Sequence, residues 1–145
     1  MIEINKATKE EILDYLLYMD GYFTPALSTI TDIYVYANKI YEKAKRIEFY
    51  NNNKFIALLA FYLNPIYSFA FITTISVNPL YARMGIAQEL LERLILICID
   101  RDICFIDLEV NINNSKALNF YEKMGFCNRE KKTETLILRR VIDTL

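Results

Sequence analysis

The chain contains no histidine among its 145 residues. This absence excludes Ser-His and Cys-His nucleophilic machinery, most catalytic zinc sites and the usual proton shuttle at neutral pH. Any proton transfer must therefore use Glu, Asp, Tyr, Lys, Cys or water, and we expect no metal cofactor.

Long hydrophobic runs are absent too. No apolar stretch approaches the roughly 18 residues of a membrane span, and the N-terminal MIEINKATKEE has no signal-peptide core. A formal net charge of -1 does not favour a broad nucleic-acid-binding face. The cysteines Cys98, Cys104 and Cys127 are odd in number and lie in apolar surroundings, which is typical of buried thiols in a reduced compartment. We therefore expect a soluble, cytoplasmic protein that binds neither membrane nor nucleic acid.

Hydrophobic residues make up 54% of the chain, enough for one domain over residues 1–145 with its own core. The hydrophobic periodicity predicts an α+β fold of α/β/α layers, with a mixed, largely antiparallel sheet of about six to seven strands and about four flanking helices. The helix within 85–100 would connect two parallel strands. The predicted strands are 2–6, 46–50, 54–63, 67–77, 104–110, 126–129 and 134–141, and the predicted helices are 8–19, 33–45, 85–100 and 114–124.

The stretch YARMGIAQEL places Gly85 and Ala87 where an apolar helix begins. The first turn of a helix has free N–H groups and a partial positive charge, so phosphate binds there when no bulky side chain blocks it. Arg83 adds a full charge, whereas Met84 and Gln88 would contribute mainly through their amides. Taken alone, the motif also fits an ordinary strand-to-helix junction.

The stretch NSKALNFYEKM places Asn114, Ala117 and Tyr121 on one face of a short helix that Gly125 would end. This face offers an amide, a gap and a phenol. The alternative is an N-cap asparagine followed by a core tyrosine.

The stretch DLEV places Asp107 and Glu109 on one face of a strand and apolar residues on the other. A partly desolvated carboxylate in a cleft suits a general base near neutral pH. The alternative is that one or both carboxylates lie at the strand end and pair with a surface lysine.

Together and in this order, these motifs resemble the Gcn5-related N-acetyltransferase (GNAT) superfamily. Its phosphate signature, Gln/Arg-x-x-Gly-x-Gly/Ala, falls on residues 82–87, and its Asn-x-x-Ala-x-x-x-Tyr pattern falls on residues 114–121 before Gly125 and Phe126. Ala82 departs from the usual Gln or Arg, so the pyrophosphate would be held mainly by the backbone amides at the start of this helix, which we call the cradle. Arg83, one place later, would be a partial substitute.

The resemblance implies an acetyl-CoA-dependent N-acetyltransferase that moves an acetyl group to a primary amine of a small molecule, protein or peptide by direct attack. Glu109 would be the base and Tyr121 the acid. Their twelve-residue spacing looks like that of ribosomal-protein alanine N-acetyltransferases, although LEV also occurs in members with small-molecule acceptors. Tyr22 and Phe23 would contact the acceptor, unless they are core aromatics. The implied residues for acetyl-CoA are Ile75, Ser76, Val77, Arg83, Met84, Gly85, Ile86, Ala87, Gln88 and Asn114.

Other interpretations follow from the same motifs. A GNAT-like domain could hold acyl-CoA as a sensor or regulatory module without turnover. A P-loop nucleotide binder is disfavoured because the chain has no Gly-x-x-x-x-Gly-Lys-Ser/Thr run. Homodimers are common in the family, but this sequence does not specify one, and it does not identify the amine acceptor.

Overall fold

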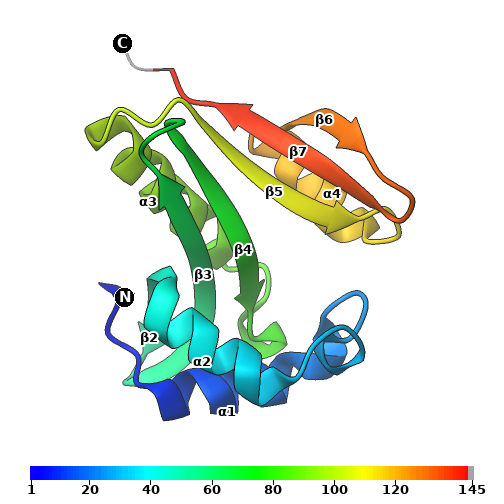
Figure 1. Ribbon diagram of the computed structural model, residues 1–145. Coiled ribbons are helices and arrows are strands. Elements are labelled where there is room, and N and C mark those ends of the chain that lie inside the picture. Colours follow the sequence, from blue (N-terminus) through cyan, green and yellow to red (C-terminus); the bar gives the residue numbers. More distant parts are fainter. Residues whose placement is uncertain (144–145) are drawn as a thin grey trace.

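The computed structural model describes residues 1–143 as a seven-stranded sheet with helices on both faces (Figure 1). The strand order is β1-β2-β3-β4-β5-β7-β6, and every neighbouring pair is antiparallel except β4 and β5, which are parallel as predicted. The strands are β1 (Ile2–Ile4), β2 (Lys45–Asn51), β3 (Lys54–Asn64), β4 (Phe69–Val77), β5 (Phe105–Asn111), β6 (Cys127–Lys131) and β7 (Thr135–Val141). The helices are α1 (Lys9–Met19), α2 (Ile33–Lys43), α3 (Ile86–Asp100) and α4 (Ser115–Lys123), with single 3-10 turns at Asp20–Tyr22, Leu27–Thr29 and Pro79–Tyr81.

The element order confirms the α+β prediction, and the main differences lie at element ends. β1 stops at Ile4 because Asn5 adopts a positive φ of 52°, a conformation that asparagine tolerates and a strand cannot include. At the start of α1, Thr8 and Glu11 form the predicted capping box: Thr8 Oγ1 accepts from Glu11 N at 3.1 Å, and Glu11 Oε1 accepts from Thr8 N at 3.0 Å.

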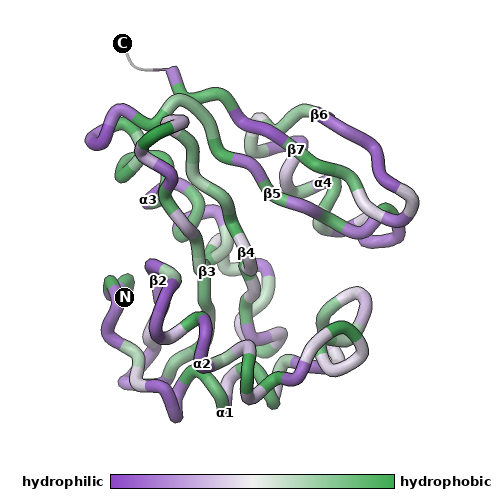
Figure 2. The backbone as a smooth tube through the Cα atoms, in the orientation of Figure 1, coloured by the Kyte–Doolittle hydropathy of each residue, from purple (hydrophilic) through white to green (hydrophobic). Residues whose placement is uncertain are grey.

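A separate hydrophobic cluster packs on each face of the sheet. α1 and α2 cover one face with residues such as Leu16 and Ile40, while α3 and α4 cover the other with residues such as Leu91 and Tyr121. β3 is mostly hydrophobic along its length, whereas the edge strand β6 is largely hydrophilic (Figure 2). None of the helices within residues 1–143 is both long and apolar enough to cross a membrane.

The cysteines correct one expectation. Cys98 lies on the buried stripe of α3, where burial raises the pKa of its thiol to about 11. Cys104 and Cys127 are exposed instead of buried, because Cys104 precedes β5 in a loop and Cys127 begins the fully exposed edge strand β6.

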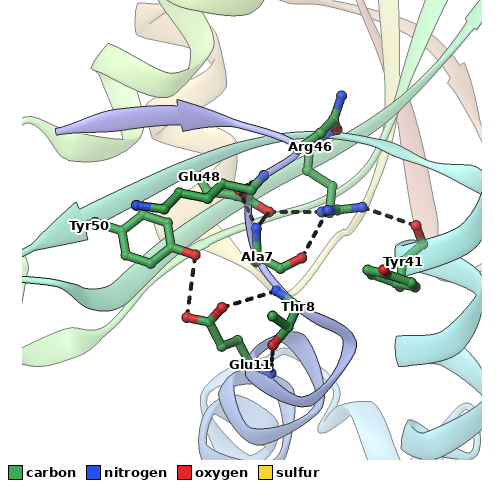
Figure 3. Close-up of polar contacts among 9 residues, drawn as sticks. Ala7, Thr8, Glu11, Tyr41, Arg46, Glu48 and Tyr50 are labelled. Atoms are coloured by element: carbon green, nitrogen blue, oxygen red, sulfur yellow. Dashed lines mark hydrogen bonds and ion pairs between the residues drawn. The ribbon is translucent and has the colours of Figure 1, made fainter.

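A buried ion pair joins β2 to the segment that enters α1 (Figure 3). Arg46 Nε donates to Glu48 Oε2 at 2.8 Å, and neither side chain exposes more than 5% of its surface. Glu48 also accepts from the backbone N–H groups of Lys6 and Ala7, while Arg46 donates to the carbonyls of Ala7 and Tyr41. Every charge is therefore matched by hydrogen bonds, as a buried pair requires.

Replacing one partner of this pair should destabilise the fold strongly. We predict that Arg46→Met lowers the free energy of unfolding by about 3 to 5 kcal/mol, because Glu48 would stay buried without its cation. Urea unfolding measures the change, with Arg129→Met on exposed β6 as a control expected to stay within about 0.5 kcal/mol. A loss for Arg46→Met no larger than the control's would show that the pair does not support the fold.

Candidate active site

β4 and β5 stop pairing partway along their length and diverge (Figure 1). Their register runs from Phe69 opposite Phe105 to Ile72 opposite Leu108. β4 nevertheless stays paired with β3 as far as Val77. Among the described residues, positions 73–77 of β4 therefore have no strand partner on the side of β5. We call the space between positions 73–77 of β4 and 109–111 of β5 the wedge.

A β-bulge lies where the wedge begins. Ala60 pairs with Thr74 and Phe61 pairs with Ile72, so Thr73 is an extra residue on β4. A bulge of this kind bends its strand and increases its twist. The bulge follows the last pair between β4 and β5 directly, and it accounts for the divergence of the two strands.

The loop after β4 presents a row of free backbone amides. The N–H groups of Tyr81 and Ala82 donate to carbonyls within the Pro79–Tyr81 turn and its cap, and the next internal bond is Glu89 N to Gly85 O at 3.0 Å. Between them, the amides from Arg83 to Gln88 donate to no acceptor within residues 1–143. Free amides at a helix N-terminus form an anion site, because their N–H groups can donate to the anion and the positive end of the helix dipole attracts it.

Gly85 makes this row accessible. It is the N-cap of α3 with a positive φ of 75°, and a Cβ built there would meet no atom within 4 Å. Arg83 also has a positive φ, 64°, so the chain curls just before the helix. Successive amides on a curled loop form an anion-binding concavity that needs no side chain, which is compatible with alanine at position 82.

Glu109 and Tyr121 lie on opposite faces of the sheet. Leu108 and Val110 of β5 are buried in the same cluster as Tyr121 of α4. Because side chains alternate along a strand, Glu109 points to the other face. A molecule in the wedge would therefore have the carboxylate on one side and the phenol on the other.

The carboxylate of Glu109 is more exposed than the sequence suggests. Its side chain keeps 38% of its accessible surface and does not lie in a closed cleft. Thr135 Oγ1 donates to its Oε2 at 2.6 Å, and Lys132 Nζ lies 3.7 Å from its Oε1.

Asp107 has a different environment although it shares the face of Glu109. Arg139 donates to both of its carboxylate oxygens, at 2.8 and 2.9 Å. This pairing raises the pKa of Arg139, whose guanidinium also stacks over the ring of Phe105, 3.7 Å from the centroid. Asp107 is thus engaged in an ion pair, and the carboxylate that borders the wedge is that of Glu109.

Asn114 is the N-cap of α4 and Tyr121 lies in the core on this helix, which is the arrangement given above as the alternative. Tyr121 is 7% exposed and packs edge-on against Phe126, and burial raises the pKa of its phenol. No hydrogen bond from its hydroxyl is formed within the described part of the chain. Asn114 is the N-cap, with its side-chain oxygen accepting from Ala117 N at 3.2 Å, so its NH₂ group stays available to a ligand.

The two residues expected to contact the acceptor have different environments in the structure. Tyr22 is 60% exposed in the loop between α1 and α2, whereas Phe23 is half-buried and packs against the cluster of α1 and α2. On β4, Ser76 contributes its hydroxyl to a 2.8 Å bond with Tyr15 of α1.

Sequence reasoning missed the residues that reach the site from distant segments. The hydroxyl of Tyr36 on α2 lies 3.3 Å from Thr73 Oγ1. Thr135 at the start of β7 and Lys132 in the turn before it contact Glu109. None belongs to a local motif, and among 11 tyrosines nothing marks Tyr15 or Tyr36.

An open groove of about 480 Å³ lies apart from Glu109 and Tyr121. We call it the α1 groove, since Tyr15 and Tyr18 of α1 form one wall and Phe55 of β3 and Leu80 form others. It contains neither the amides from Arg83 to Gln88 nor the free edge of β4.

Several solved structures of acetyltransferases share this architecture. The crystal structure of the ribosomal-protein-S18-alanine N-acetyltransferase from Escherichia coli matches with a TM-score of 0.77 and 22% identity, covering 100% of this chain and 96% of that chain. The PaiA N-acetyltransferase from Thermoplasma acidophilum, in complex with coenzyme A, matches with a TM-score of 0.75 and 18% identity over 97% and 99% of the two chains. Tetrahymena GCN5 matches with a TM-score of 0.75 and 13% identity over 100% and 98%.

The seven-stranded mixed sheet with four helices is therefore the fold of these acetyltransferases. The model of the acetyltransferase (GNAT) family matches residues 15–126. The chain belongs to this family.

Proposed function

We propose that the protein transfers an acetyl group from acetyl-CoA directly to a primary amine of a small molecule, protein or peptide. The observation that carries this proposal is the wedge, whose free strand edge leads into the free amides from Arg83 to Gln88. One extended ligand with an amide-bearing arm and a diphosphate matches both features. The relative from T. acidophilum, solved in complex with coenzyme A, supports the choice of ligand.

In this proposal acetyl-CoA binds mainly through backbone groups. The amides of its pantetheine arm pair with the free edge at Ile75 and Val77, as an added strand would. Its pyrophosphate accepts hydrogen bonds from the amides before α3, close to the positive end of the helix dipole. The free NH₂ of Asn114 reaches the arm from α4.

The proposed chemistry uses the two faces of the sheet. Glu109, directly or through water, takes a proton from the ammonium of the acceptor, since an amine with a reference pKa of about 10.4 is mostly protonated at neutral pH. The nitrogen lone pair attacks the thioester carbon, and a backbone N–H near Val77 stabilises the oxyanion. As the C–S bond breaks, Tyr121 protonates the thiolate, and the second nitrogen proton passes through solvent to restore the phenol.

The free amides from Arg83 to Gln88 give a first test. We predict that Gly85→Val weakens acetyl-CoA binding at least about tenfold, because a side chain at positive φ strains the loop and enters the path to the amides. Arg83→Ala should weaken it only about two- to fivefold, as loss of an exposed charge does. Isothermal titration calorimetry measures both. Equal losses in the two variants would contradict a cradle made of backbone amides.

The acid role gives a second test. We predict that Tyr121→Phe lowers kcat for thiol release about 100-fold, the usual contribution of a general acid, with acetyl-CoA affinity unchanged. The hydroxyl forms no hydrogen bond to the described residues, so the melting temperature should stay the same. Because the buried phenol has a raised pKa, it remains protonated throughout the neutral range and donates there. Unchanged turnover would remove Tyr121 from this role.

The base role gives a third test, which also separates an enzyme from a sensor. We predict that Glu109→Gln lowers kcat about 100-fold and removes the limb of the rate profile that rises with pH. The assay measures thiol release against a panel of primary amines. An unaltered profile would point to another base. A melting-temperature shift with acetyl-CoA but no thiol release from any amine would instead favour a non-catalytic acyl-CoA sensor.

A further inference from the structure

Both oxygens of the Glu109 carboxylate face side chains from the hairpin of β6 and β7. Thr135 Oγ1 donates to Oε2 at 2.6 Å, and Lys132 Nζ lies 3.7 Å from Oε1. Lys132 N donates to Thr135 O at 2.8 Å and closes the turn between β6 and β7. A further bond, from Ile112 N to Glu134 O at 3.0 Å, ties the turn to the end of β5. The carboxylate and its partners thus belong to one braced unit.

The two contacts differ in strength. Thr135 is the first residue of β7, pairs with Asn111 across the ladder, and has a short, β-branched side chain with few rotamers. Its hydroxyl makes a short bond to a charged acceptor, which is among the stronger hydrogen bonds. Lys132 is 49% exposed at its side chain, and 3.7 Å is too long for a hydrogen bond. The lysine contact is therefore weak and screened by salt, and Oε1 keeps its capacity to accept.

We propose that Thr135 positions the Glu109 carboxylate, and that the ammonium of Lys132 occupies the place which the acceptor's own ammonium takes when it binds. This inference rests on the proposed function, in which the acceptor arrives as a cation, and it assigns the place where that cation binds. With Oε2 held by Thr135, the acceptor's N–H bonds to Oε1 and its proton moves there. The neutral amine then attacks the thioester carbon. After Glu109 has released its proton to solvent, the ammonium of Lys132 returns to its place beside Oε1.

The inference predicts different kinetic effects for the two residues. Thr135→Val, which keeps the shape and removes the hydroxyl, should lower kcat about tenfold through loss of positioning. Thr135→Ser, which keeps a hydroxyl, should retain most of the wild-type kcat. Lys132→Met should lower the KM for the amine about two- to fivefold, the range of an exposed ion pair, with a smaller change in kcat. The KM for acetyl-CoA should not change in any of these variants.

The same hairpin offers matched controls. Thr133→Val changes an exposed threonine of the same turn. Lys131→Met removes the same charge one residue earlier, at a position that pairs with Leu136, whose side chain packs against the core on the side of α4. Both controls should match the wild type in kcat, in both KM values and in melting temperature.

The experiment measures steady-state thiol release for the wild type, these variants and Glu109→Gln. If Glu109→Gln loses turnover but Thr135→Val and Lys132→Met behave like their controls, the inference is wrong and the proposed function stands. A drop in kcat for Thr135→Val that serine does not rescue also overturns the positioning role. A wild type that acetylates no amine, or a fully active Glu109→Gln, refutes the proposed function and with it this inference.

Discussion

The candidate site depends on the point at which β4 and β5 lose their pairing. Up to Ile72 and Leu108 the two strands satisfy one another's backbone groups, and beyond that point the bulge at Thr73 turns β4 away. Backbone N–H and C=O groups require partners, so a strand edge left open inside a sheet is a binding surface for an extended ligand. The proposed reaction assigns its acetyl donor to this opening.

The arrangement of α1 follows from the buried pair beneath it. Arg46 and Glu48 hold the segment that enters α1 against β2, and the helix then carries Tyr15 to its bond with Ser76 on the open half of β4. On the opposite face, α4 carries Tyr121 into the core under β5. The helices on the two faces of the sheet are thus held by separate sets of contacts. The proposed reaction places Glu109 on one face and Tyr121 on the other.

Local patterns were sufficient to predict most of the fold. The helical stripe of α3, the alternation of β5 and the capping box of α1 each depend on neighbours within a few residues, and all three are present in the structure. The open space at the start of α3 was also predictable from sequence, because it depends on the small size of Gly85.

The environment of the carboxylates was not readable from sequence. Arg139 reaches Asp107 and Thr135 reaches Glu109 only because β7 pairs with β5, and no short motif encodes a partner 32 or 26 residues away. For the same reason the exposure of Glu109 differs from expectation, since it depends on which distant elements pack over β5 and not on the residues around position 109. The exposed cysteines follow this rule as well, because burial of Cys127 depended on β6 being an inner strand and it is an edge.

The central claim is that acetyl-CoA lies along the open edge of β4 with its diphosphate on the backbone amides before α3. At 17.1 kDa the protein suits amide-resolved NMR, and titration of the ¹⁵N-labelled chain with acetyl-CoA tests the claim most directly. The account predicts that the largest shifts fall on the amides of Arg83 to Gln88 and of Thr73 to Val77. Shifts confined to the α1 groove, around Tyr18 and Phe55, with the amides of Arg83 to Gln88 unmoved, would contradict it.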